Sequence, residues 1–332
     1  MTHKLIRTPR ARLAGVAGAA AAGSLLLSSC GLGTSAGISP SGELGPKLAS
    51  VKKLDGAEIA VGSKQFTEQQ ILGKIAVILL QSAGGNVKDF TTIPGSAAAR
   101  EAQIQGQTTF SWEYTGTAWI TYMGHTKPIP DPRKQFDAVK AEDAKNGLTW
   151  LQYAPMNNTY GFAAKEATAK KFNVKSLSDL KKVPKAQRTL CVDTEFANRD
   201  DGLEPMLKAY GIPLGSEIPR NQIKKLESGA IYAATNNGLC NFGEVFTTDG
   251  RIKVLKLQVL ADDKKFFPLY NVAPVFSTKT LEKNPQLSDL FGPVSKKLTN
   301  ETMIELNAKV DVDGENPSDA PFDWLKKEGF IK

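Results

Sequence analysis

Ser111-Trp112-Glu113-Tyr114-Thr115-Gly116-Thr117 is the stretch around which this chain is organised. It ends a predicted strand in which successive side chains alternate, so its two aromatic rings point to one face and its carboxylate to the other. The glycine permits a sharp turn, and the last threonine can cap a helix over the apolar residues 118–123. Open α/β sheets bind ligands where a strand ends and a helix begins. Taken alone, two such rings are more often buried core aromatics than part of a site.

The composition limits the classes of protein to consider. A chain of 332 residues holds about two domains, and 41% hydrophobic with 23% charged residues is typical of a globular protein. The two histidines, His3 and His125, argue against a histidine-rich metal site and leave any histidine-based catalysis to His125. No GxGxxG or P-loop motif occurs, so we expect no cofactor and no metal. No basic run contains interleaved aromatic residues, which excludes a nucleic-acid partner.

The N-terminus predicts export. Four basic residues (Lys4, Arg7, Arg10 and Arg12) precede an apolar run at 13–27 that is too short and too rich in Gly and Ala for a membrane span. Removing these four charges reduces the formal net charge from +8 to +4. Residues 1–29 are therefore interpreted as a signal peptide. Leu27-Ser28-Ser29-Cys30-Gly31 resembles the lipobox of bacterial lipoproteins, which implies that Cys30 is acylated; an ordinary secretory signal is the alternative. Residues 30–54 are rich in Gly, Ser and Pro, and we expect a flexible tether.

Cys191 and Cys240 remain as an even pair in an exported chain. A disulfide between them would close a loop of about 50 residues and stabilise the fold by roughly 4 kcal/mol. Two buried free thiols are the alternative, because the sequence does not determine the distance between them.

Strand and helix patterns alternate twice along the chain. Strands at 59–62, 87–93 and 108–114 enclose helices at 67–81 and 96–105, the first with a predicted capping box of Thr67 and Gln70. A second series has strands at 189–193, 239–246 and 254–260 and helices at 201–210 and 223–235. This predicts an α/β fold of two lobes, each a sheet flanked by helices, with a ligand cleft between them. Lobe 1 comprises residues 55–156 and 268–332, and lobe 2, inserted into it, comprises 157–267.

Five motifs in order carry a family resemblance: Val61-Gly62-Ser63-Lys64-Gln65-Phe66-Thr67-Glu68-Gln69, Glu113-Tyr114-Thr115-Gly116-Thr117, Asn157-Asn158-Thr159-Tyr160, Phe246-Thr247-Thr248-Asp249-Gly250-Arg251-Ile252 and Phe267-Pro268-Leu269-Tyr270-Asn271. Together they resemble the substrate-binding lipoproteins of glycine betaine/carnitine/choline ABC transporters, over nearly all of the chain from about Asp55. The resemblance implies a two-lobed periplasmic-binding-protein fold of type II. It also implies delivery of the ligand to a membrane permease that a separate ATPase drives.

The resemblance also implies the site residues. Four aromatic residues would form a box around a quaternary ammonium group: Tyr114, Tyr160, Phe246 and Tyr270. Three further residues match positions that bind the ligand's carboxylate: Lys64, Thr117 and Arg199. Two departures stand out, since Phe246 replaces the usual tyrosine and Ala98 falls near an aspartate of choline-selective members.

The chemistry of these residue types supports that assignment. A trimethylammonium group has no N–H to donate, so aromatic faces must select it by cation–π attraction of about 0.5–2 kcal/mol each. Cationic side chains bind a carboxylate, and the arginine guanidinium binds it most strongly because it can donate two parallel hydrogen bonds. We therefore expect zwitterions to bind better than plain cations, because Lys64 and Arg199 would gain partners only from a ligand carboxylate. Without the resemblance, Arg199 would be interpreted as a solvated ion pair.

The function expected is that of a non-enzymatic solute receptor for uptake of a quaternary amine such as glycine betaine. We expect a monomer on the outer face of the cytoplasmic membrane, anchored through Cys30. Three alternatives stay open: the same fold binding an unrelated solute, an exported hydrolase, and a purely structural envelope lipoprotein.

Overall fold

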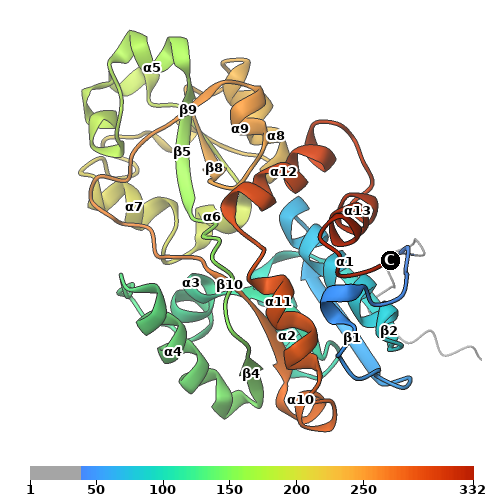
Figure 1. Cartoon of the computed structure of the whole chain (residues 1–332). Helices are drawn as coiled ribbons and strands as arrows, with labels where there is room; N and C mark the ends of the chain where they lie inside the picture. The colour runs from blue at the N-terminus through green and yellow to red at the C-terminus, as the bar shows by residue number, and fades with distance from the viewer. Residues whose placement is uncertain (1–38) are drawn as a thin grey trace, which may run out of the picture. The chain divides into compact units, whose positions relative to one another are not determined.

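The computed structural model describes residues 39–332, which form two five-stranded sheets flanked by helices (Figure 1). The first sheet has the order β2 (Asn86–Ile93), β1 (Glu58–Lys64), β3 (Phe110–Tyr114), β10 (Val272–Ser277), β4 (Leu148–Trp150). The second has the order β7 (Ile223–Lys225), β6 (Leu190–Val192), β8 (Phe242–Phe246), β5 (Tyr160–Lys165), β9 (Leu257–Val259). In each sheet the first three strands are parallel and the fourth runs antiparallel to both of its neighbours.

The helices lie between and beside these strands, and none among residues 39–332 has the length and apolar character of a membrane span. Their bounds are α1 (Thr67–Ser82), α2 (Gly95–Ile104), α3 (Thr115–Thr117), α4 (Pro132–Asp143), α5 (Glu166–Phe172), α6 (Thr194–Asn198), α7 (Leu203–Ala209), α8 (Ser228–Asn236), α9 (Arg251–Val254), α10 (Thr278–Lys283), α11 (Leu287–Ser295), α12 (Asn300–Asp311) and α13 (Asp319–Lys327).

The chain crosses between the sheets twice, and the two crossing segments are bonded to each other. After β4 it leaves the first sheet, builds the whole second sheet and returns through β10. Asn157 and Asn271 form an isolated antiparallel bridge, and the Asn158 N–H donates to the Tyr270 carbonyl at 3.2 Å. The strands of the second sheet therefore all lie between β4 and β10 in the chain.

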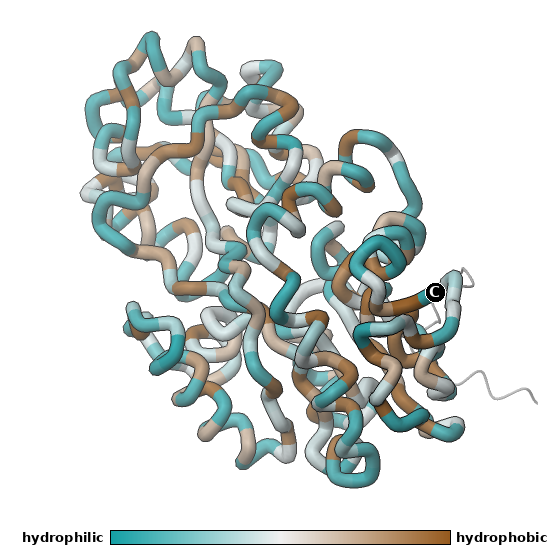
Figure 2. The backbone as a smooth tube through the Cα atoms, in the orientation of Figure 1, coloured by the Kyte–Doolittle hydropathy of each residue, from teal (hydrophilic) through white to brown (hydrophobic). Residues whose placement is uncertain are grey.

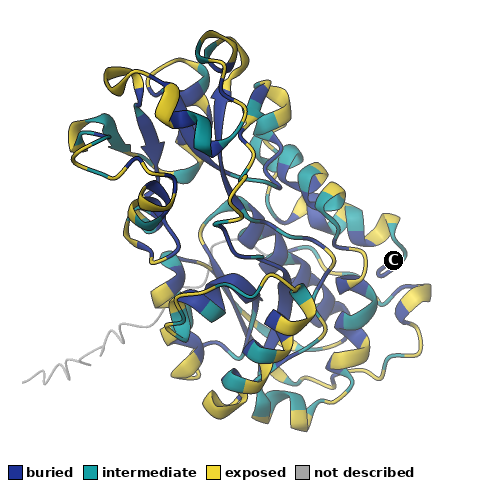
Figure 3. Cartoon of the chain, turned by 90° about the vertical axis from the view of Figure 1, so that its left-hand side faces the viewer, coloured by how far each residue is buried: buried dark blue, intermediate teal, exposed yellow. Residues whose placement is uncertain are grey.

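Apolar side chains from α1 and from the first sheet form a buried core. Helix α1 packs on β1 and β2, and Ile71, Ile75 and Ile78 are fully buried. Phe110 lies 4.6 Å from Phe276 and 4.9 Å from Phe291, measured between ring centroids. Figure 2 shows the hydrophobic residues gathered along the strands and the adjoining helices, and Figure 3 shows those strands buried while the outer loops are exposed.

Several local expectations were wrong. No capping box forms on α1: Phe66 is its N-cap residue, and the Thr67 hydroxyl instead donates to Asp311 at 2.7 Å. Residues 223–225, predicted to be helical, form β7, because this segment pairs in parallel with β6. Sequence patterns miss such features since the partner lies far away along the chain.

The segment 42–54 was predicted to be part of a flexible tether but lies against the first lobe. The Gly45 N–H donates to the Phe330 carbonyl at 2.7 Å, and Leu48 and Leu54 are buried. A Cβ atom at Gly42 would stand 2.4 Å from the Lys332 carbonyl oxygen, so the glycine permits this close approach. Cys30 and the predicted signal peptide lie outside the described residues.

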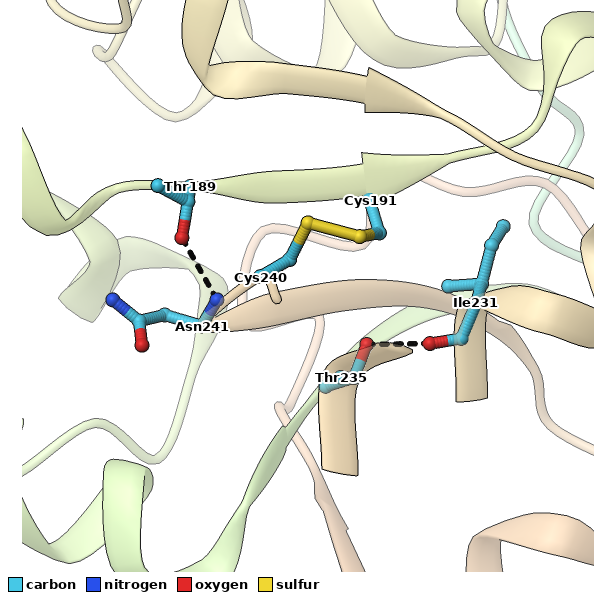
Figure 4. Close-up of a disulfide and its surroundings, with 6 residues drawn as sticks. All are labelled: Thr189, Cys191, Ile231, Thr235, Cys240 and Asn241. Atoms are coloured by element: carbon cyan, nitrogen blue, oxygen red, sulfur yellow. Dashed lines mark hydrogen bonds between the residues drawn. A yellow bond between two sulfur atoms is a disulfide. The ribbon is translucent and has the colours of Figure 1, made fainter. Parts of the chain in front are cut away.

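Cys191 and Cys240 form a disulfide in this structure (Figure 4). Cys191 lies in β6 and Cys240 lies just before β8, and both are fully buried. The bond joins two neighbouring parallel strands of the second sheet. Of the two alternatives that the sequence left open, the structure contains the bridge.

Candidate ligand-binding site

A cavity of about 150 Å³ lies where the strand ends of the two sheets face each other. All seven residues expected at the ligand line it: Lys64, Tyr114, Thr117, Tyr160, Arg199, Phe246 and Tyr270. Lys64 ends β1 and Tyr114 ends β3 in the first sheet, whereas Tyr160 begins β5 and Phe246 ends β8 in the second. Segments far apart in the sequence therefore meet at one place.

The aromatic rings surround part of this cavity. Tyr160 and Phe246 lie directly opposite each other in neighbouring strands, with ring centroids 5.4 Å apart. The Tyr270 ring meets Tyr160 edge-on at 5.4 Å. Phe66, which the sequence analysis assigned no role in the site, stacks 5.3 Å from Phe246 and 6.3 Å from Tyr114. Its position at the junction of β1 and α1 was the available signal, since ligands bind at such junctions.

Of residues 111–117, some lie in the hydrophobic core and others line the cavity. Trp112 is completely buried and packs 5.8 Å from Phe291, so the core interpretation holds for this ring. Tyr114 reaches the cavity, and its hydroxyl donates to Glu68 at 2.7 Å. Gly116 leaves room for Tyr270, because a Cβ atom there would lie 2.7 Å from the Tyr270 ring. Thr117 does not cap the next helix; it ends α3 and continues directly into helical residues 118–122.

Lys64 is not an unpaired cation. Its ammonium group donates to Glu113 Oε1 at 2.7 Å, and both side chains are at most 5% exposed. The Tyr122 hydroxyl donates to the second Glu113 oxygen at 2.7 Å. Glu113 points away from the Trp112 face, as strand alternation predicted, and there it neutralises Lys64.

Arg199 is also paired. Its Nε and Nη2 atoms donate to the two oxygens of Asp201 at 2.6 and 2.7 Å, and the Tyr270 hydroxyl donates to the same carboxylate at 2.5 Å. Burial alone would lower the pKa of Arg199, but the neighbouring Tyr160 and Asp201 raise it well above its usual range. The ion pair weighed from the sequence is real, although it is buried rather than solvated. The expectation that both site cations stand unpaired is wrong.

Acidic residues that the sequence analysis missed complete the lining. Asp193 and Glu195 come from the start of α6, and Glu227 precedes α8. Burial would raise the pKa of Glu195, but the charges of Lys64 and Arg199 and the bonds from Ser96 hold that pKa below its usual range. Glu195 is therefore an anion inside the cavity. No motif marked it, because its partners come from three separate segments.

His125 lies elsewhere on the fold. Its ring stacks on Trp119 with centroids 3.5 Å apart, and its Nε2 atom lies 2.9 Å from Glu142. It does not line the cavity. Among residues 39–332, no group of three or more His, Cys, Asp or Glu residues is arranged to hold a metal ion.

The comparisons with known proteins agree with this geometry. Residues 57–327 match the model of the substrate binding domain of ABC-type glycine betaine transport systems. A glycine-betaine-binding protein of Pseudomonas aeruginosa is 39% identical over 281 residues, covering 82% of this chain and 88% of that protein. The carnitine transport binding protein OpuCC of Listeria monocytogenes is 30% identical over 313 residues, covering 93% and 94%.

A solved structure supports the same relationship. The crystal structure of a glycine betaine/carnitine/choline ABC transporter protein superposes with a TM-score of 0.67 at 26% identity, covering 83% of this chain and 100% of that chain. This likeness confirms the predicted two-lobed periplasmic-binding-protein fold of type II.

Proposed function

The chain belongs to the family of substrate-binding domains of ABC-type glycine betaine transport systems, and we propose that within this family it captures glycine betaine. It is the extracytoplasmic substrate-binding protein of a quaternary amine importer and not an enzyme. We further propose that it delivers its ligand to the membrane permease of that importer, as a monomer.

One observation carries the proposal: aromatic faces and two cationic side chains line the same cavity between the sheets. Tyr114, Tyr160, Phe246 and Tyr270 are assigned to the quaternary ammonium group, which has no N–H to donate and which aromatic faces attract by cation–π interaction. Lys64, Thr117 and Arg199 are assigned to the carboxylate end. Because Lys64 is paired with Glu113 and Arg199 with Asp201, a ligand carboxylate would share both cations with protein carboxylates.

The attachment to the membrane is a separate proposal that rests on the sequence alone. We propose that residues 1–29 are removed, that Cys30 carries acyl chains and that the residues up to about 41 form the tether. Burying acyl methylenes contributes about 0.8 kcal/mol each, so such chains hold the protein at the membrane. Cys30→Ala should release the protein from the membrane fraction or leave it unprocessed, as fractionation and mass measurement would show.

The lobes are proposed to be residues 55–156 with 268–332, and 157–267. Each would move as a body about the paired crossing segments when ligand enters. The two segments are bonded at Asn157 and Asn271, which supports a common hinge.

Calorimetric titration of the purified chain tests the ligand assignment. Glycine betaine, carnitine and choline should give saturable binding, whereas glucose and glutamate, which lack a quaternary ammonium group, should give none. Tight binding of an unrelated solute with no response to any quaternary amine would contradict the assignment of glycine betaine.

A further inference from the structure

Glu195 forms bonds on both sides of the cavity. Its Oε1 atom accepts from the Ser96 hydroxyl at 2.5 Å and lies 3.1 Å from Arg199 Nη1. Its Oε2 atom accepts the Ser96 backbone N–H at 3.1 Å. Ser96 belongs to α2 beside the first sheet, whereas Glu195 and Arg199 belong to the second α/β unit. The carboxylate therefore joins the site arginine to the opposite lobe.

Glu195 occupies part of the guanidinium group of Arg199 that a ligand carboxylate would use. An arginine fork presents its N–H groups on Nε, Nη1 and Nη2. Asp201 takes Nε and Nη2, and Glu195 takes Nη1. Three of the five N–H groups of the guanidinium thus have a carboxylate partner within the protein. A ligand carboxylate at Arg199 has to displace Glu195 or lie beside it.

We propose that Glu195 is a specificity-determining residue, an internal carboxylate that competes with the carboxylate of a zwitterionic ligand and favours ligands of net positive charge. This inference rests on the proposed quaternary amine function and deepens it. Lys64 and Arg199 supply two positive charges. The carboxylates of Glu113, Asp201 and Glu195, which contact them, supply three negative charges. The immediate surroundings of the ligand are therefore net anionic.

The charge balance has opposite consequences for two ligands of similar size. A plain cation such as choline gains attraction from Glu195 and offers no group that Glu195 repels. Glycine betaine carries its own carboxylate, which Glu195 would repel if that carboxylate bound at Arg199. Removing the charge should therefore weaken one ligand and strengthen the other. A purely structural role, as a link between lobes, would change both affinities in the same direction.

The test compares glycine betaine and choline by calorimetric titration of the purified full chain and its Glu195→Gln variant. Glutamine keeps the length of the side chain and one carbonyl oxygen, which can accept from one of the two Ser96 donors. We expect the ratio of choline Kd to betaine Kd to rise by roughly tenfold, with tighter betaine binding and weaker choline binding. Glu195→Ala, which removes the group altogether, should shift the ratio in the same direction and provides a second readout if the glutamine variant is poorly folded.

Two controls separate charge from structure. Glu227→Gln removes the same charge from an exposed lining residue, where solvent screens it, and should change the ratio by less than about threefold. Ser96→Ala removes the hydroxyl bond between the lobes but keeps the backbone N–H bond and the Glu195 carboxylate, so both ligands should weaken together. An unchanged ratio in both Glu195 variants, with both ligands still binding, would overturn this proposal and leave the proposed function standing. Binding of neither ligand to the parent chain would overturn both.

Discussion

Lys64 Nζ lies 2.7 Å from Glu113 Oε1, and the two side chains are 4% and 5% exposed. The pair joins the end of β1 to β3, so two neighbouring strands supply the two charges. Glu113 also accepts the Tyr114 backbone N–H at 2.7 Å. The strand that carries Tyr114 thus also supplies the carboxylate that fixes the position of Lys64 at this side of the cavity.

Glu113→Gln should lower the free energy of unfolding by about 3–5 kcal/mol, because it leaves the buried Lys64 ammonium without its counter-ion. Urea unfolding followed by circular dichroism measures this. The matched control is Glu58→Gln, which breaks the exposed Lys88–Glu58 pair at 3.7 Å and should cost less than about 1 kcal/mol. Equal effects of the two substitutions would show that the buried pair carries no special weight.

Tyr160 tests the aromatic contribution to binding. Tyr160→Phe keeps the ring, and the Tyr160 hydroxyl has no hydrogen bond to any residue that the structure describes, so affinity should change little. Tyr160→Leu removes the π face and should weaken every quaternary amine by roughly 2–30-fold, corresponding to about 0.5–2 kcal/mol of cation–π attraction. Titration of both variants with choline and glycine betaine gives the comparison. If the leucine variant bound as tightly as the phenylalanine variant, Tyr160 would not belong to the box.

The disulfide should stabilise the second α/β unit. Cys191 and Cys240 are separated by 49 positions, and closing a loop of that length corresponds to about 4 kcal/mol in the chain-entropy model. Replacing both cysteines by alanine should therefore cost roughly 2–5 kcal/mol in urea unfolding. Peptide mass spectrometry without reductant should show the cross-link in the parent chain. Reductant should destabilise the parent chain but leave the double variant unchanged, which serves as the control.

Much of the fold could be predicted because it depends on local patterns. The alternation of strands and helices before Tyr114 and after Tyr160 indicated two α/β units, and the predicted strand at 189–193 contains the observed β6. The strand β7 was missed because its identity comes from pairing with β6, and its three residues have no helical or strand period of their own. The docked segment 42–54 was missed because its partners lie at the other end of the chain.

For the site, the sequence predicted residues that line the cavity but not how their charges are paired. The four aromatic residues and Lys64 could be located by their motifs and Arg199 by the family resemblance, and all six line one cavity. The ion pairs of the two cations could not be predicted, because Lys64 and Glu113 are 49 positions apart in the sequence and only the neighbouring strands bring them together. Glu195 was missed for the same reason, since Ser96 lies 99 positions away. Local patterns locate groups, whereas the pairing of charges depends on tertiary structure.

The pH dependence of stability should depend in part on Glu244, a fully buried carboxyl in β8. Its Oε2 atom accepts the Asp193 backbone N–H at 2.8 Å, and its Oε1 atom has no hydrogen-bond partner among the described residues. Burial, together with the nearby charges of Asp193 and Glu195, raises the pKa of Glu244 well above its usual 4.5. The folded chain therefore keeps a proton that the unfolded chain loses above about pH 4.5.

The proton that the folded chain keeps on Glu244 determines whether the free energy of unfolding rises or falls with pH. Where the folded state binds more protons, the free energy of unfolding falls as pH rises, by up to about 1.4 kcal/mol per pH unit for one group. This loss begins near the unfolded pKa and ends once pH passes the raised folded pKa. Glu244→Gln keeps an oxygen for the Asp193 N–H and cannot ionise, so its stability should decline less than that of the parent chain between pH 5 and 8. Urea unfolding at four pH values measures the difference, with the exposed Glu166→Gln as the control that should follow the parent. Because Asp193 and the other buried acids are present in both chains, parallel curves for the parent and Glu244→Gln would show that Glu244 does not titrate in this range.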